Sequence, residues 1–308
     1  MTSSPGNMPL RRRTAVGAVV QGIVLLAAVA YIGYGLVHEW GSLREHKWTL
    51  RWAPLLLSLP LAAGWFLCRA WLWERLLDSF GYRVPYRRAF RTWVLSELAR
   101  YVPGKIWIVV GRTYYSARDG VPASIVVTGM AFELGLVALS ATAFFLVRAA
   151  AASRLVHIPG LWVAIGALLL VVLAHPRIIT PVVNAALRRL GQPMIPRQLH
   201  YRALLAMVAL CALMWVCMCA GFALLAVSIA TVGAGDLIGI AASFPVAWVI
   251  ALVSVVAPAG LGVREGVLAA LLSGVLPEGM ALAVALASRV WVTSVELACA
   301  AIAWWLRK

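Results

Sequence analysis

Charge is scarce in this chain, and negative charge is the scarcest. Charged residues make up 12% of the 308 residues, with 11 Asp and Glu against 27 Lys and Arg, while hydrophobic residues make up 63%. A soluble domain of this size does not contain several apolar runs of about 20 residues, so the composition excludes a soluble globular protein. It predicts an all-α polytopic membrane protein. The basic surplus must crowd into loops and ends, where it favours anionic membrane lipids as partners and not nucleic acid.

Motifs of the common catalytic and cofactor sites are also missing. The sequence has no HExxH zinc motif, no Walker loop and no GxSxG nucleophile turn, and its five histidines fall in loops or at the ends of apolar runs. The five cysteines sit in apolar segments, which argues against a disulfide framework and against a metal site. We therefore expect a transporter with no cofactor and no bound metal, and not an enzyme.

Apolar runs and basic segments predict how the chain is threaded through the membrane. Six runs are long enough for a full crossing: about 14–37, 53–77, 121–147, 158–174, 203–230 and 281–306. The most basic segments are 11–13, 83–91 and 176–202. By the positive-inside rule these segments and both termini lie in the cytoplasm, in a bacterial plasma (inner) membrane. The basic cytoplasmic linker 176–202 divides a single membrane domain, 1–308, into halves 14–175 and 203–306.

Two further apolar stretches, about 91–120 and 243–276, are interrupted by proline, glycine and charged residues. We expect each to form a broken helical hairpin that re-enters the membrane from one side, in addition to about six full transmembrane helices. One hairpin would enter from each side, so that their tips meet near the midplane, as in transporters built from inverted repeats. The alternative is eight full spans, which leaves the termini on the same side.

The later interrupted stretch carries its charges directly after the break. Pro258, Gly260 and Gly262 stop the first apolar arm, because proline removes a helix donor and glycine permits non-helical backbone angles. Lipid cannot satisfy the freed backbone groups, so the break needs protein or water around it. Arg264 and Glu265, which are candidates for an ion pair, follow at the positive end of the second arm, where an anion is favoured. A plain polar loop between two ordinary spans is the alternative.

The earlier interrupted stretch has similar features. Its apolar arms are each about ten residues long, and they are interrupted by Glu97, Arg100, Pro103, Gly104 and Lys105. Glu97 and Arg100 are helix neighbours at a spacing of three and are expected to neutralise each other in part, which leaves Lys105 for an anion. The alternative is that these charges only anchor a surface helix among the lipid headgroups.

Charged residues also interrupt the full crossings. Glu133 would be protonated as an unpaired carboxylate at mid-depth unless it faces a cation across the bundle. The candidate cations are Arg69, Arg100, Lys105 and Arg289. Arg289 and Glu296 are seven residues apart, so they share one face of the last helix and are expected to point inward. The crossing that carries Glu133 is predicted to end near Val147, which places Arg148 in the segment after it.

Two motifs carry a resemblance to a known family. They are RYVPGK at 100–105, followed by GR at 111–112, and PxGLGVRE at 258–265. Together they resemble the flippase-like family that includes the transmembrane region of lysylphosphatidylglycerol synthases, and the similarity in span arrangement covers nearly the whole chain. Ala259 stands where a glycine is common in that family. The sequence contains no soluble aminoacyl-transferase domain, so lysyl transfer is not implied.

The resemblance implies lipid translocation. The implied function is to move an anionic phospholipid, a lipid-linked sugar or a hopanoid-type lipid across or between membranes. The alternatives are a non-transporting membrane partner that supports a lipid- or glycan-synthesising enzyme, and an intramembrane enzyme. Arginine suits a phosphate because its planar fork bonds two oxygens at once, and nearby glutamates would hold such cations in the empty site. The candidate headgroup path consists of Arg100, Pro103, Gly104, Lys105, Arg112, Glu133, Pro258, Gly260, Gly262, Arg264, Glu265, Arg289 and Glu296.

Overall fold

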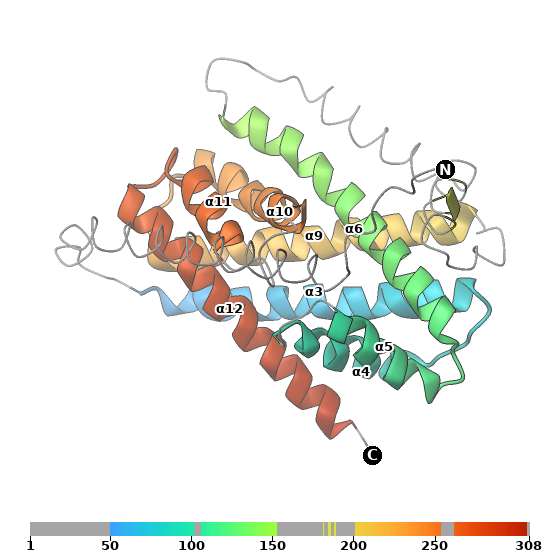
Figure 1. Ribbon diagram of the computed structural model, residues 1–308. Helices are drawn as coiled ribbons and strands as arrows, with labels where there is room; N and C mark the ends of the chain where they lie inside the picture. The colour runs from blue at the N-terminus through green and yellow to red at the C-terminus, as the bar shows by residue number, and fades with distance from the viewer. Residues whose placement is uncertain are drawn as a thin grey trace, which may run out of the picture.

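The structure is a computed structural model of the chain. It describes residues 50–101, 106–152, 201–253 and 262–306, and a few single positions between 181 and 188. The described residues fold into helices and turns without a strand, which confirms the all-α class (Figure 1). Two predicted crossings and most of the linker lie outside the described residues: 14–37, 158–174 and 176–202.

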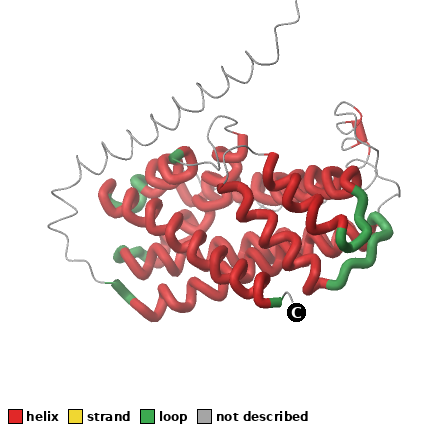
Figure 2. Tube along the Cα trace, turned by 60° about the horizontal axis from the view of Figure 1, so that its bottom comes forward, coloured by secondary structure: helices red, strands yellow, loops and turns green. Residues whose placement is uncertain are grey.

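Five helices within the described ranges are long and apolar enough to cross a membrane. Four of them match predicted full crossings: α3 (Trp52–Ser79), α6 (Ala123–Ala152), α9 (Tyr201–Ile229) and α12 (Glu278–Trp305). In Figure 2 the long helices lie alongside one another as a bundle, with most of the described loops at its two ends. This is the architecture of a polytopic helical membrane protein, as predicted.

The fifth of these helices begins earlier than predicted. It is the first arm of the later interrupted stretch, and it starts with a 3-10 turn, η2 (Ala234–Asp236), that leads into α10 (Leu237–Val253). The sequence predicts a start near residue 243, but the apolar run already begins at Leu237, and an apolar helix tolerates the single Gly239. The 19 residues of Ala234–Leu252 are long enough to cross by themselves. The first arm is therefore longer than a re-entrant arm needs to be.

The helix that carries Glu133 runs further than predicted. The expected end near Val147 is wrong, because α6 continues to Ala152. Four consecutive alanines follow Arg148, and alanine has the highest helix propensity, so the helix persists through them. Arg148 consequently lies inside a helix, where it is only 9% exposed.

Glycine lets the central helices approach closely. α3 and α9 lie side by side, and α12 crosses both (Figure 1). A Cβ atom at Gly221 of α9 would lie 3.0 Å from the ring of Trp291 in α12 and 3.2 Å from Leu61 in α3. The indole N–H of Trp291 donates to Ser58 Oγ of α3 at 2.9 Å. Small residues and inter-helical hydrogen bonds are the typical causes of helix association in lipid, where the hydrophobic effect is absent.

The earlier interrupted stretch forms a broken pair of short helices, as predicted. α4 (Tyr86–Glu97) runs into a 3-10 turn, η1 (Leu98–Tyr101), and α5 (Ile106–Ala117) returns. Each α-helical arm has 12 residues, about 18 Å, and is too short to cross a bilayer alone. α4 packs against α3, α5 and α12, which buries its apolar side. The first arm is thereby held against the long helices α3 and α12.

The later interrupted stretch resumes as a helix where predicted. Its second arm, α11 (Val263–Leu272), has only 10 residues, about 15 Å. The N-cap residue Gly262 has a φ of 81°, a left-handed conformation that favours glycine. The Glu265 carboxylate accepts the backbone N–H of Gly262 at 2.9 Å and closes the cap. α11 therefore begins at a defined point, with its two charged residues in the first turn.

The two broken segments enter the bundle from opposite ends. The first segment follows the carboxyl end of α3, and the second follows the carboxyl end of α9. The backbone N–H of Arg51, just before α3, donates to the carbonyl of Ser228 near the end of α9 at 2.9 Å. The end of α9 thus lies beside the start of α3, so the segments approach the interior from opposite sides, as the sequence predicts.

Candidate functional site

A cavity of about 530 Å³ lies where the two broken segments meet the long helices. It is lined by α4, η1 and α5 of the first segment, by α10 and α11 of the second, and by all four long helices. Its charged lining residues are Arg69, Glu97, Arg100, Arg112, Glu133, Arg264 and Arg289. Its aromatic lining residues are Trp65, Phe66, Trp93, Tyr101, Phe244 and Trp248. A charged, aromatic cavity of this size suits a ligand with a polar headgroup.

Glu133 is the centre of the first charged cluster. It is 1% exposed on α6. One carboxylate oxygen, Oε1, accepts the indole N–H of Trp93 at 2.8 Å and lies 2.8 Å from Arg69 Nη2. The other, Oε2, accepts Arg112 Nη1 at 2.7 Å. Arg69, one of the four candidate cations, lies against Glu133, and Arg112 is a second partner that the sequence does not reveal. Glu133 is therefore a paired carboxylate and not an unpaired one.

Arg112 uses all of its nitrogens within the protein. Besides Glu133, it donates from Nη2 to Glu97 Oε1 at 2.7 Å and from Nε to Ser96 Oγ at 3.0 Å. Its guanidinium also lies over the ring of Trp93, 5.4 Å from the centroid. Arg112 lines the cavity, as expected of a path residue. Because its donors are occupied, its role in this arrangement is to hold Glu97 and Glu133 in place.

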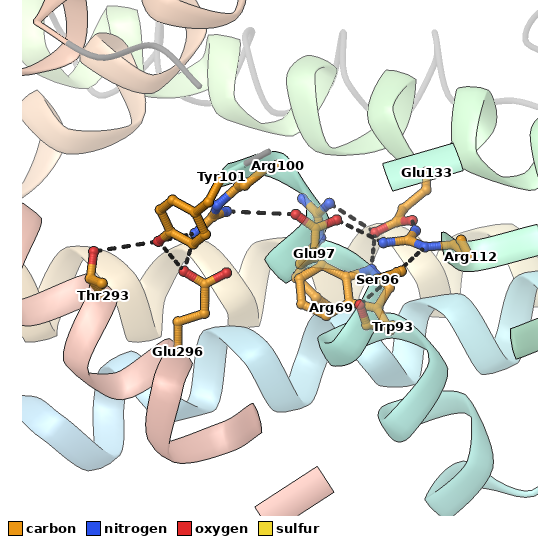
Figure 3. Close-up of polar contacts among 10 residues, drawn as sticks. All are labelled: Arg69, Trp93, Ser96, Glu97, Arg100, Tyr101, Arg112, Glu133, Thr293 and Glu296. Atoms are coloured by element: carbon orange, nitrogen blue, oxygen red, sulfur yellow. Dashed lines mark hydrogen bonds and ion pairs between the residues drawn. The ribbon is translucent and has the colours of Figure 1, made fainter. Parts of the chain in front are cut away.

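The cluster continues to α12 through the tip of the first broken segment. Arg100 Nη1 lies 3.6 Å from Glu97 Oε2, so the predicted pairing exists, but Arg100 also donates from Nη2 to Glu296. The hydroxyl of Tyr101 donates to Glu296 Oε2 at 2.7 Å and lies 3.5 Å from Thr293 Oγ1. Figure 3 shows Glu97 between Arg112 on one side and Arg100 on the other. Cations and carboxylates therefore alternate from α3 to α12.

Arg264 and Glu265 form a second cluster at the start of α11. Arg264 Nη2 lies 3.1 Å from Glu265 Oε1, which confirms the predicted pair, and Arg289 Nη1 lies 3.6 Å from the same oxygen. The guanidinium of Arg264 lies over the ring of Phe244 at 5.3 Å. Its Nε and Nη2 atoms are buried without a hydrogen bond to any described residue. Nη2 is thus ion-paired with Glu265, and Nε has no hydrogen-bond partner among the described residues, so the Arg264 guanidinium is less fully hydrogen-bonded than that of Arg112.

Cations slightly outnumber carboxylates in the two clusters. Among the described residues they contain five arginines and four glutamates: Arg69, Arg100, Arg112, Arg264, Arg289, Glu97, Glu133, Glu265 and Glu296. The prediction that Arg289 and Glu296 both turn inward is confirmed, since Arg289 lines the cavity and Glu296 is 0% exposed. One positive charge remains in excess, and it favours an anion in the cavity.

Some predicted site residues cannot be placed, and others were missed. Pro103, Gly104, Lys105, Pro258 and Gly260 lie outside the described residues. Trp93 of α4 and Tyr101 of η1 are partners of Glu133 and Glu296 that were not among the predicted site residues. A signal for Trp93 was available, because it lies one helical turn before Glu97 and so shares its face. Tyr101 belongs to the RYVPGK motif, but nothing in that motif points to Glu296 as its partner.

Comparison with known proteins assigns the chain to a family. A family model described as "Lysylphosphatidylglycerol synthase TM region" matches residues 16–297. A search of curated proteins found no match. The matched range includes both interrupted stretches, the helices α3, α6 and α9, and α12 as far as residue 297. The chain belongs to the family of the lysylphosphatidylglycerol synthase transmembrane region and is an integral membrane protein.

Proposed function

We propose that this protein is a lipid translocase that moves a lipid with an anionic headgroup across or between membranes. The observation that carries the proposal is the cavity itself, where broken segments from opposite sides converge and where the edge of the lining residue Arg264 is incompletely hydrogen-bonded by the described residues. A guanidinium edge of this kind bonds two phosphate oxygens at once. The lipid classes that fit are those expected from the sequence: an anionic phospholipid, a lipid-linked sugar or a hopanoid-type lipid with such a headgroup.

The carboxylates of the site support this proposal. Glu133, Glu265 and Glu296 each lie against an arginine, which is the arrangement expected if they hold the cations in position while the site is empty. The headgroup enters from the cytoplasmic leaflet, meets Arg100 at the first broken segment and passes to Arg264 at the second. Its acyl chains stay in the lipid. The path involves no chemical reaction and no cofactor.

Reconstitution tests the translocase directly. Purified protein in phosphatidylcholine vesicles that contain a dye-labelled phosphatidylglycerol should make the inner-leaflet dye accessible to a membrane-impermeant quencher faster than in protein-free vesicles. Isoprenoid-linked sugars and hopanoids extend the panel and identify the lipid. If folded protein moves none of these lipids, the proposal is wrong, and a membrane partner of a lipid- or glycan-synthesising enzyme takes its place.

The orientation of the site gives a second prediction. The proposal requires both termini in the cytoplasm of a bacterial plasma membrane, with residues near 41 and 152 outside. A cysteine introduced as Ser42→Cys should therefore react with an impermeant thiol reagent added from outside the cell. Its control is Arg83→Cys, because the Arg83 side chain is 95% exposed in a loop predicted to be cytoplasmic, and it should react only after the membrane is opened. Labelling of the Ser42→Cys protein from the cytoplasmic side alone would reverse the orientation.

A further inference from the structure

Arg148 is a buried cation that lies outside the two charged clusters. It sits near the carboxyl end of α6 and is 9% exposed. Its Nε donates to Ser243 Oγ in α10 at 3.0 Å, and its Nη2 donates to the backbone carbonyl of Leu271 in α11 at 2.5 Å. Within the described part of the chain it forms no ion pair. A buried guanidinium without a carboxylate needs another source of negative potential.

The carboxyl end of α11 provides that potential. The last carbonyls of a helix lack partners within the helix and carry the negative end of its dipole, which favours a cation there. Leu271 is the second-last residue of α11, so its carbonyl is one of these groups. Ser243 is itself fixed, because its hydroxyl donates to the carbonyl of Gly239 at 2.8 Å. Arg148 therefore joins α6, α10 and α11 at one point.

α11 is short enough for this contact to act along its whole length. Leu271 and Arg264 lie at opposite ends of the same 10-residue helix, about 15 Å long. Within the described residues, α11 packs mainly against α10 and α12. The hydrogen bond from Arg148 to Leu271 also connects α11 to α6, the helix that carries Glu133. A shift of the tied end moves the other end, because a single short helix behaves as a rigid body.

We infer that Arg148 is a positioning residue of the headgroup site: by fixing the carboxyl end of α11 to α6 and α10, it keeps Arg264 on the cavity wall. The consequence for transport rests on the proposed function. The consequence for the position of α11 does not, and it can be measured separately.

The test uses the full-length protein with Arg148→Met, which keeps the length of the side chain and removes every donor. A reporter cysteine, Val263→Cys, marks the start of α11, and Ile108→Cys marks the cavity wall on α5 as a control. Cys217 is first replaced by alanine, since the other four native cysteines are buried. Transport is measured with dye-labelled phosphatidylglycerol in phosphatidylcholine vesicles. Thermal unfolding and size-exclusion chromatography establish that each variant is folded.

Arg148→Met should change the thiol-labelling rate at the Val263 reporter and leave the rate at the Ile108 reporter as it is. Transport should fall by about tenfold or more, since hydrogen bonds from a charged donor are each typically worth at least this factor. Arg148→Lys keeps one charged donor group. It should restore part of the wild-type labelling rate at the Val263 reporter and part of the transport rate. Arg118 is exposed, and its side chain contacts Tyr114 among the described residues, so Arg118→Met serves as the matched control and should leave the labelling rate and transport unchanged.

Two results overturn the inference. Unchanged labelling at the Val263 reporter in folded Arg148→Met protein shows that Arg148 does not position α11, whatever happens to transport. Equal changes of the labelling rate at both reporters show a general loosening of the bundle and not a positioning effect. If Arg148→Met does not fold, the labelling rates at the two reporters are compared in Arg148→Lys instead. Absence of transport in the wild-type protein defeats the proposed function alone, because the labelling comparison remains valid.

Discussion

Replacement of Glu133 by glutamine should lower the free energy of unfolding by about 3 to 5 kcal/mol, because it leaves buried arginines without their counter-charge. The carboxylate of Glu133 lies 2.8 Å from Arg69 and 2.7 Å from Arg112, and both arginines are buried. Glutamine keeps the shape of the side chain and the acceptor for Trp93 but loses the negative charge. Denaturant unfolding in detergent micelles measures the effect.

Matched variants separate this effect from a general sensitivity to lost charge. Asp78 lies 4.0 Å from Arg83 with both side chains exposed, so Asp78→Asn should change stability by less than about 1 kcal/mol. Adding Arg69→Met to Glu133→Gln removes one of the two stranded cations and should recover part of the loss, as contacting residues are not additive. A Glu133→Gln protein as stable as the wild type would show that the cluster does not depend on this carboxylate.

Arg264 should have the largest effect on transport. Arg264→Gln removes the guanidinium that we assign to the headgroup phosphate, and each of two charge-assisted hydrogen bonds to phosphate oxygens is worth about 1.5 to 3 kcal/mol, so transport should fall on the order of 100-fold or more. Arg264→Lys keeps the charge but loses the planar fork that bonds two oxygens at once, so transport should fall less than in Arg264→Gln. The measurement is the rate of dye-labelled phosphatidylglycerol movement in vesicles.

A double change distinguishes a phosphate contact from a mere counter-ion. If Arg264 only balances Glu265, removing one partner is costly and removing both restores much of the stability. Glutamine at 265 still accepts the Gly262 N–H, as glutamine does in a capping box, so the start of α11 is preserved. A folded Arg264→Gln, Glu265→Gln protein that moves no lipid supports the transport role. A stable and fully active double variant refutes it.

Local features of the site were predictable from the sequence because they depend on neighbours in the chain. Gly262 caps α11 because its backbone conformation suits glycine, and Glu265 lies three residues later in the capping position. The pair of Glu97 with Arg100 follows from helix spacing. The long helices follow from apolar length alone.

Contacts between distant helices were not predictable in the same way. α6 is apolar on every side, so the hydrophobic pattern does not say which way Glu133 points. Its partner Arg112, and the pairing of Arg100 with Glu296, depend on how four helices are rotated against one another. The position of Arg148 was mistaken for a related reason: a charge after a long apolar run suggests the end of a span, although the alanines beyond it continue the helix.

The adjacent charges at the start of α11 have a consequence for the response to the membrane potential. Arg264 and Glu265 are the only charged residues of α11, and the preceding segment 254–261 contains none. Any displacement of this arm through the bilayer therefore carries no net charge across the electric field. A single elementary charge moved across 100 mV would change the energy by about 2.3 kcal/mol. If the protein moves a lipid as proposed, voltage would thus act on the anionic headgroup, and the charges of α11 would add no voltage-dependent cost to a displacement of the arm.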